Sequence, residues 1–199
     1  MRPALHLALT LLLAALPALA GPKPKVLFKT TAGAFTLELE PEAAPKTVEN
    51  FLGYVNSGFY KGLVFHRVIP SLMIQGGGFT TDLKEKVGGA SIPNEAKQAL
   101  AKGLKNTRGT IAMARTWIPD SAKAQFFINV ADNAARWDPP SQDGYGYCVF
   151  GRVVAGMDVV DKIRNGKTGT RSGMRDVPVK PVVVLDATEI KAKAPAKRK

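Results

Sequence analysis

The sequence contains very few of the residues that bind metal ions or act as nucleophiles. Among its 199 residues there is one cysteine, Cys148, and there are two histidines, of which only His66 lies outside the apolar N-terminal stretch. A single cysteine excludes an intramolecular disulfide. One histidine and one cysteine cannot supply the nitrogen and sulfur ligands of a typical zinc site, so we expect no metal.

Cys148 lies in the apolar run YGYCVFGRVV, which predicts a buried strand. A cysteine in such a strand behaves as a small hydrophobic residue. We therefore interpret Cys148 as an inert core residue. A catalytic thiol, which needs a paired histidine, is the alternative.

Sequence motifs for cofactors and covalent catalysis are absent as well. There is no P-loop, no GxGxxG after a strand, no HExxH and no CxxC pair. Residues 76–78, GGG, lack the spacing and the following Lys-Ser/Thr of a phosphate loop. Ser57 and Ser71 have no nucleophile-elbow context, which disfavours a catalytic triad centred on His66. We expect no cofactor and a reaction without a proton relay.

No apolar run in the N-terminal region is long enough to cross a bilayer, which takes roughly 20 residues. Arg2 is followed by the apolar residues 5–16 and then by Ala18-Leu19-Ala20. This order is typical of a secretory signal with a small-residue cleavage site. We predict a signal peptide over residues 1–20 and an exported protein that begins near Gly21; a buried N-terminal helix is the alternative.

Acidic residues are scarce relative to basic ones, 16 against 28, and the net charge is +12. The basic residues include the end of the chain, 191–199, KAKAPAKRK, for which we predict a disordered tail. A sequence pI near 9.9 raises the hypothesis of nucleic-acid binding. Export and the absence of an RNA-binding module argue against it, so no nucleic acid is expected, and acidic partners or an anionic membrane surface are the other interpretation.

The body of the chain, residues 21–190, reads as one domain of many short strands. A hairpin is predicted over 25–40, with its turn at Thr31-Ala32-Gly33. Apolar spacing predicts helices over 45–58 and 156–166. Further strands are predicted over 63–69, 72–77, 109–115, 124–130, 145–154 and 180–190. Short strands with two isolated helices favour a barrel or a sandwich.

Five sequence blocks, in order, resemble the cyclophilin family of peptidyl-prolyl cis–trans isomerases. They are APKTVENF, FHRVIPSLMIQGGGFT, NTRGTIAMART, AQFFINV and YCVFGRVVAGMDVVDKI. GGGFT and GTIAMART are most similar to exported bacterial members, which implies a periplasmic location, with secretion as the alternative. The resemblance extends from about Lys25 to Ile190. It implies a mainly β fold: a closed eight-stranded antiparallel β-barrel capped by two α-helices.

The same resemblance implies a reaction and the residues that perform it. The substrates would be proline-containing unfolded or partly folded polypeptides, and the protein would act as a monomer that assists folding. Rotation of a prolyl peptide bond needs a hydrogen-bond donor aimed at the prolyl nitrogen, for which a permanently charged guanidinium is suited. By position in the family motifs, Arg67 and Gln75 are predicted to be catalytic. The predicted substrate-binding residues are His66, Leu72, Met73, Ala114, Arg115, Phe127, Trp137 and Tyr147.

Several positions depart from the family pattern. Leu72 stands where many members have phenylalanine, Arg115 where many have asparagine, and Tyr147 where many have histidine. In the long loop ARWDPPSQDGYGY, Trp137 fits either the family tryptophan position or the apolar position beside it. We favour the second, with Arg136 in the tryptophan position, which predicts weak binding of cyclosporin, the family's cyclic-peptide inhibitor. A noncatalytic binding module or chaperone, its pocket weakened by Leu72, is the alternative function.

Overall fold

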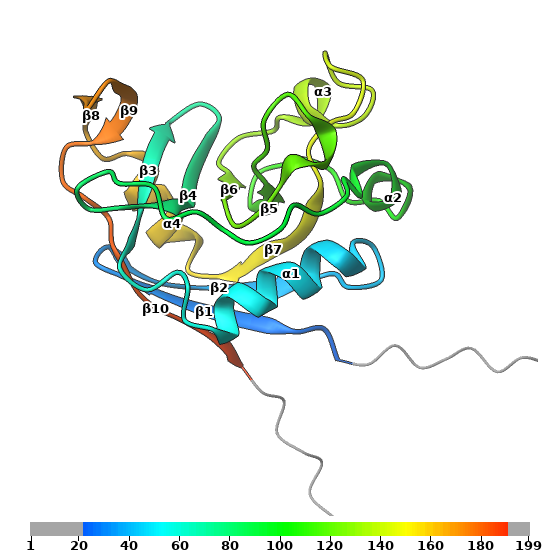
Figure 1. The fold of residues 1–199 in the computed structure, drawn as a ribbon, viewed down its shortest axis with the longest axis horizontal. Coiled ribbons are helices and arrows are strands. Elements are labelled where there is room, and N and C mark those ends of the chain that lie inside the picture. The colour runs from blue at the N-terminus through cyan, green and yellow to red at the C-terminus, as the bar shows by residue number, and fades with distance from the viewer. Residues whose placement is uncertain (1–21, 191–199) are drawn as a thin grey trace, which may run out of the picture.

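The computed structural model describes residues 22–190, which form one curled antiparallel sheet with helices on both sides (Figure 1). The predicted signal peptide and basic tail lie outside these residues. The strands are β1 (Lys25–Thr30), β2 (Gly33–Leu39), β3 (Leu63–Ile69), β4 (Met73–Thr80), β5 (Thr110–Met113), β6 (Phe126–Asn129), β7 (Val149–Ala155), β8 (Thr168–Arg171), β9 (Met174–Pro178) and β10 (Val184–Ile190). The helices are α1 (Pro45–Asn56), α2 (Ala96–Ala101), α3 (Ala134–Trp137), α4 (Met157–Arg164) and the 3₁₀ turn η1 (Pro119–Ser121).

The main sheet has eight strands in the order β10-β1-β2-β7-β5-β6-β4-β3. Its edge strands, β10 and β3, approach each other but form no ladder. They are joined by one bridge, Val64–Val183, and by hydrogen bonds such as Phe65 N to Val182 O at 3.0 Å. The predicted closed barrel is therefore wrong in this respect: the sheet is a half-barrel that is open between β3 and β10.

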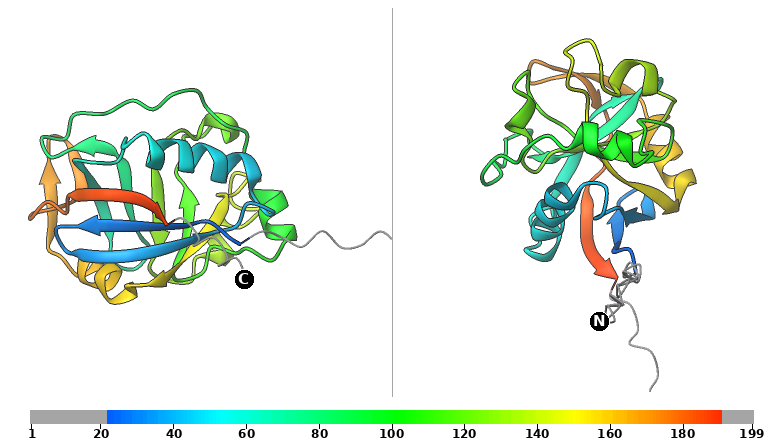
Figure 2. Two further views of the ribbon diagram at one scale, coloured as in Figure 1. Left: turned by 90° about the horizontal axis from the view of Figure 1, so that it is seen from below. Right: turned by 90° about the vertical axis from the view of Figure 1, so that its right-hand side faces the viewer.

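The two predicted helices correspond to α1 and α4, which lie on opposite sides of the molecule (Figure 2). The prediction of only two helices is wrong, because α2 and α3 are formed within the two long loops. The separate β8–β9 hairpin was also not predicted. These elements are four to six residues long. They are too short to show a clear hydrophobic period.

Alternation along the strands divides the apolar residues between two faces of the sheet. In β6, Phe126 and Ile128 belong to the main core, whereas Phe127 points to the opposite face. In β4, Ile74 belongs to the main core and Met73 points to the opposite face. Successive side chains of a strand alternate between faces, so one FFIN segment serves both the core and an external cluster.

The main core is rich in aromatic residues. Seven rings are at most 1% exposed: Phe28, Phe35, Phe51, Tyr60, Phe65, Phe126 and Phe150. Most contacts are tilted or edge-to-face, such as Phe51–Phe126 at 5.7 Å and 89°. Tyr60 donates its hydroxyl hydrogen to Ala124 O at 2.9 Å, which satisfies the one polar atom that it buries. This core packs against the inner face of β4 and β6, through Ile74, Phe126 and Ile128.

Irregular pairing between β3 and β4 determines which residues face outward. His66 is one extra residue on β3, because Phe65 pairs with Gly76 and Arg67 with Gln75. Gly77 and Gly78 are extra residues on β4, between the pairs Val64–Phe79 and Phe65–Gly76. A Cβ at Gly77 would lie 2.9 Å from Ala124 O, and its φ is +84°. The GGG run is therefore explained as a bulge against neighbouring backbone, without phosphate chemistry.

The start of α1 is stabilised by a carboxylate from a distant loop. Glu95 accepts hydrogen bonds from Thr47 N at 2.8 Å, Thr47 Oγ1 at 2.7 Å and Lys46 N at 3.2 Å. Glu95 is 9% exposed. The free N–H groups and positive dipole end of α1 favour this negative charge. The loop before α2 is thereby fixed to α1.

Replacing Glu95 with Gln should lower the free energy of unfolding by about 1–3 kcal/mol, because hydrogen bonds to a charged acceptor are lost or weakened. Urea denaturation measures the change. Glu49→Gln, an exposed position on α1 with the same change of charge, is the matched control and should alter stability by less than about 0.5 kcal/mol. Equal effects of the two substitutions would contradict the capping role.

Candidate functional site

The predicted catalytic residues occupy one transverse row of the sheet. Arg67 on β3 pairs with Gln75 on β4, Gln75 pairs with Phe127 on β6, and Phe127 pairs with Ala112 on β5. Neighbouring strands are about 4.8 Å apart, so the backbones at Arg67 and Phe127 are separated by roughly 10 Å. The row therefore places a guanidinium, an amide and an aromatic ring side by side.

Around Phe127 the outer face carries an apolar cluster, which we call the outer cluster. Met73, Ala112, Phe127 and Val149 are at most 4% exposed. The partly buried residues packed on them include Leu72, Ala114, Trp137 and Tyr147. The Phe127 ring lies 4.9 Å from Trp137 and 5.5 Å from Tyr147, both edge-to-face. All six apolar residues predicted to bind substrate are thus brought together.

Arg67 lies beside the outer cluster and is open to solvent. Its side chain is 47% exposed, and Nε is 3.7 Å from Asp176 Oδ2 on β9. An exposed ion pair of this length contributes little to stability. A cavity of about 390 Å³ is lined by Arg67, Gln75, Gln125 and Asp176, among others. The guanidinium therefore has donors available for a ligand.

Gln125 and Asp176 were missed by the sequence analysis. Gln125 accepts a hydrogen bond from Gln75 Nε2 at 3.0 Å, which orients the Gln75 amide. Its position two residues before Phe127 in a strand was the available signal, since alternate residues share a face. Asp176 comes from the hairpin that follows α4, and no local pattern pointed to its approach to Arg67.

A buried polar network supports the loops around the outer cluster. Asn129 donates to Asn106 Oδ1 at 3.2 Å and to Thr110 Oγ1 at 2.9 Å, and it accepts from Asn133 Nδ2 at 2.7 Å. Asn133 also donates to Leu72 O at 2.9 Å. Asn106 donates to Asp138 Oδ1, next to Trp137, and to Tyr147 O. The network links three residues of the cluster to the strand that carries Phe127.

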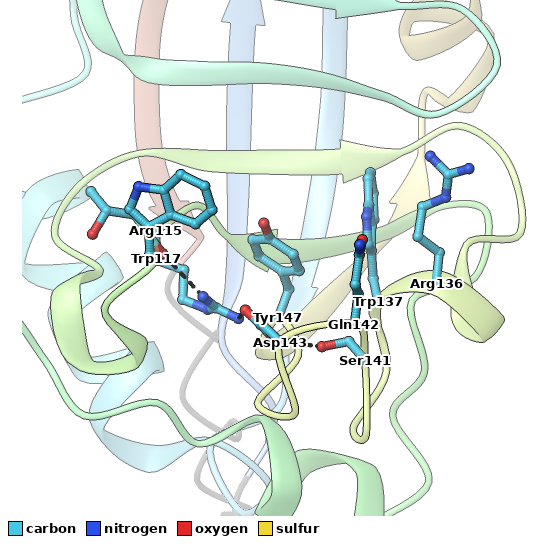
Figure 3. Close-up of a pocket in the computed structure, with 9 residues that line it drawn as sticks. Arg115, Trp117, Arg136, Trp137, Ser141, Gln142, Asp143 and Tyr147 are labelled. Atoms are coloured by element: carbon cyan, nitrogen blue, oxygen red, sulfur yellow. Dashed lines mark hydrogen bonds and ion pairs between the residues drawn. The ribbon is translucent and has the colours of Figure 1, made fainter.

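Arg115 was predicted to contact substrate; its guanidinium binds other residues of this chain (Figure 3). It is 3% exposed, pairs with Asp143 and donates to Gly146 O at 2.8–3.0 Å. It also lies over the Tyr147 ring at 4.6 Å. These contacts assign the Arg115 side chain to holding the 138–147 loop. Ala114 N donates to Gln125 O at 3.0 Å, so within the described residues the Ala114 carbonyl and the Arg115 backbone are the groups left for a ligand.

His66, which was predicted to contact substrate, is only 2% exposed and lies in the wall of the cavity beside Arg67. Its ring packs on Phe79 at a centroid distance of 4.6 Å, and Nδ1 has no hydrogen-bond partner. Burial, and to a lesser degree the positive charge of Arg67, lowers the pKa of His66 to about 4. The imidazole is therefore neutral near pH 7 and supports the strand beneath the site.

Protonation of His66 should make the protein less stable in mild acid. Its pKa is about 4 when folded and about 6.5 when unfolded, so the unfolded chain binds the extra proton between these values. As pH falls through this window, stability should decrease by about 3 kcal/mol in total. Replacing His66 with Gln should remove this part of the pH dependence, measured by urea unfolding at pH 7 and pH 4. The same loss in both proteins would contradict the assignment.

Neither a metal nor a reactive thiol is indicated at this site. Within residues 22–190, no group of His, Cys, Asp and Glu side chains could hold a metal ion. Cys148 is buried, and burial raises its pKa to about 12, which keeps the thiol protonated. The arrangement can grip an apolar ring and donate hydrogen bonds from a fixed charge. In the same residues, no helix is long and apolar enough to cross a membrane.

Comparisons with known proteins agree on one family. The family model described as "Cyclophilin type peptidyl-prolyl cis-trans isomerase/CLD" matches residues 25–189. The chain is 56% identical over 159 residues to peptidyl-prolyl cis-trans isomerase cyp18 of Streptomyces antibioticus, covering 79% of this chain and 93% of that protein. It is 52% identical over 165 residues to peptidyl-prolyl cis-trans isomerase B of Escherichia coli, covering 82% and 98%.

The fold is also similar to a solved structure. A crystal structure of a Cryptosporidium parvum cyclophilin type peptidyl-prolyl cis-trans isomerase matches with a TM-score of 0.68 and 24% identity, covering 85% of this chain and 99% of that one. The same protein was solved in the presence of the dipeptide Ala-Pro, and that structure matches with a TM-score of 0.66. At this level of identity, the likeness concerns the fold.

Proposed function

The chain belongs to the cyclophilin-type peptidyl-prolyl cis-trans isomerases, and we propose that it isomerises X-Pro bonds of exported proteins and so assists their folding. The observation that carries the site assignment is the row Arg67–Gln75–Phe127. It sets a charged donor and an apolar cluster at a separation that suits one prolyl residue and its neighbours.

The proposed mechanism follows from the geometry. The proline ring packs on Met73 and Phe127, with Leu72, Trp137 and Tyr147 around it. Arg67 donates a hydrogen bond to the prolyl nitrogen, whose lone pair becomes an acceptor as the amide loses its double-bond character. Gln75, oriented by Gln125, binds the adjacent carbonyl. The backbone of Ala114 and Arg115 aligns the client chain.

Energies show that no single contact is sufficient. The uncatalysed barrier is about 18–20 kcal/mol, and a millionfold acceleration requires about 8 kcal/mol. One charged hydrogen bond contributes roughly 1.5–3 kcal/mol. The remainder is supplied by removing water from the amide on the outer cluster and by holding the chain on both sides of the proline.

Two experiments test the function and the location. NMR exchange spectroscopy on an Ala-Pro peptide should show line broadening that depends on catalytic amounts of the protein; its absence would overturn the catalytic assignment.

Fractionation and mass spectrometry of the protein from its source should find a start near Gly21 outside the cytoplasm. An intact Met1 in the cytoplasmic fraction would overturn export. We propose a monomer, which sedimentation tests.

Cyclosporin should inhibit weakly. Trp137 packs on Phe127, and the preceding Arg136 is exposed, which supports the register that puts Arg136 in the family tryptophan position. Without an indole donor at the rim, a polar group of the ligand is left unpaired, at about 1–3 kcal/mol. This corresponds to roughly tenfold to hundredfold weaker inhibition.

The substitution Arg136→Trp should make inhibition by cyclosporin stronger, as measured in an inhibition titration. Tyr145→Trp, at an exposed position in the same loop, serves as control and should leave inhibition weak. Nanomolar inhibition of the unsubstituted protein would show that Trp137 occupies the rim position and that the register is wrong.

A further inference from the structure

Next to the outer cluster lies a second hollow, of about 960 Å³, from which the mechanism uses only the residues shared with the cluster and the Arg115 backbone. Trp117 and Trp137 stand on opposite sides of Tyr147, with Arg115 and Asp143 paired at the base (Figure 3). The hollow shares Trp137 and Tyr147 with the outer cluster. A side chain of the client can therefore reach this hollow while a proline of the same polypeptide is bound on the outer cluster.

Trp117 is the unusual element of this hollow. It is 90% exposed and its neighbour Ile118 is 65% exposed, so this turn presents contiguous apolar surface to solvent. Its loop is braced: Ser121 Oγ accepts from Thr116 N at 3.0 Å and donates to Ile118 O at 2.7 Å. The indole is thus presented on a constrained turn, which reduces the entropy lost when a ligand packs against it.

The charges at the base of the hollow are already neutralised within the chain. Asp143 pairs with Arg115 and accepts hydrogen bonds from Ser141 Oγ at 2.6 Å and from Tyr145 N at 3.0 Å. The Ser141 hydrogen bond, chiefly, holds the pKa of Asp143 well below its usual range. No charge remains at the base to bind an ionic guest, and the exposed Arg136 at the edge opposes a cationic one.

We propose that this hollow is a subsite for an aromatic side chain of the client, close in sequence to the isomerised proline. The aromatic rings that line the hollow are Trp117, Trp137 and Tyr147, of which Tyr147 has the Arg115 guanidinium over one face, and such a lining favours an aromatic ring. Arg136 can add a cation–π contact. A ring stacked on Trp137 lies within roughly 10 Å of Phe127, about three residues of extended chain.

This inference rests on the proposed function, and its test is a phenylalanine scan. Peptides with one Ala-Pro bond carry Phe in place of Ala at each position up to three residues on either side. At one position, Phe should raise kcat/KM about fivefold or more over Ala, and Trp117→Ala should reduce that ratio to below about twofold. Ile118→Ala, an exposed neighbour that does not line the hollow, should keep the wild-type ratio.

The outcomes separate the subsite from the isomerase assignment. No turnover of any peptide would overturn the function itself. Turnover with no Phe preference, or with a preference that survives Trp117→Ala, would overturn the subsite alone. A binding readout is also available, because both tryptophans of the chain line the hollow. The preferred Phe peptide should change tryptophan fluorescence at lower concentration than its Ala counterpart, and equal midpoints would overturn the subsite.

Discussion

Replacing Arg67 with Ala should lower kcat/KM for a prolyl peptide by at least tenfold, with the fold unchanged. A charged hydrogen bond to the prolyl nitrogen contributes about 1.5–3 kcal/mol, and each 1.36 kcal/mol is a factor of ten in rate. Stability should change by less than about 0.5 kcal/mol, since Arg67 is half exposed and its ion pair with Asp176 is long. NMR exchange rates and urea denaturation measure the two quantities.

Arg152→Ala is the matched control for this substitution. Arg152 is also an exposed strand arginine in an ion pair, with Glu38 at 2.9 Å, but it lies on β7 away from the outer cluster. Its loss should leave kcat/KM within twofold. Normal activity of a folded Arg67→Ala protein would refute the catalytic assignment. Equal losses in both variants would indicate a general effect of charge.

The largest loss of stability outside the aromatic core is expected for Asn129→Ala. Asn129 is fully buried and makes three hydrogen bonds. Its removal leaves Asn106 Oδ1 without that donor and opens a small void, at a cost of about 3 kcal/mol. The loops that hold Leu72 and Trp137 should loosen as well, so KM for a prolyl peptide should rise.

Asn56→Ala gives the comparison, because Asn56 is exposed and makes one hydrogen bond, to Glu189 at 3.0 Å. It should lower the midpoint of thermal unfolding far less than Asn129→Ala does. If Asn129→Ala unfolds at the same temperature and has the same KM as the unsubstituted protein, the network does not support the site.

The sequence predicted the elements whose own periodicity is strong. The run LVFHRVI is β3 to the residue, and Pro45 begins α1 as expected. The open edge between β3 and β10 could not be predicted, because it depends on pairing between residues more than a hundred positions apart. The helix α2 could not be predicted from its own sequence, because its position depends on Glu95 and on contacts with β7.

At the site, the sequence motifs predicted which residues lie together, but not how each side chain is paired or buried. The family resemblance assigned Arg67, Gln75 and Phe127 to one site, and they lie in one row of the sheet. Arg115 and His66 come from the same motifs, but the Arg115 guanidinium is paired with Asp143 and bonded to Gly146 O. The His66 side chain is buried. Burial and internal pairing depend on loops such as 138–147, whose geometry no local pattern specifies.

The extra residue in β3 determines which face of the sheet carries Arg67. A strand alternates its side chains, so an extra residue has to be absorbed by an irregularity if the residues on both sides of it are to keep their faces. Phe65 and Arg67 flank His66 and pair with the consecutive residues Gly76 and Gln75, so they lie on opposite faces of the sheet. Counting by twos from Phe65 would instead place Arg67 on the core side. A pattern search that assumes strict alternation would therefore assign the guanidinium to the wrong side of the sheet, even when every letter of the motif matches.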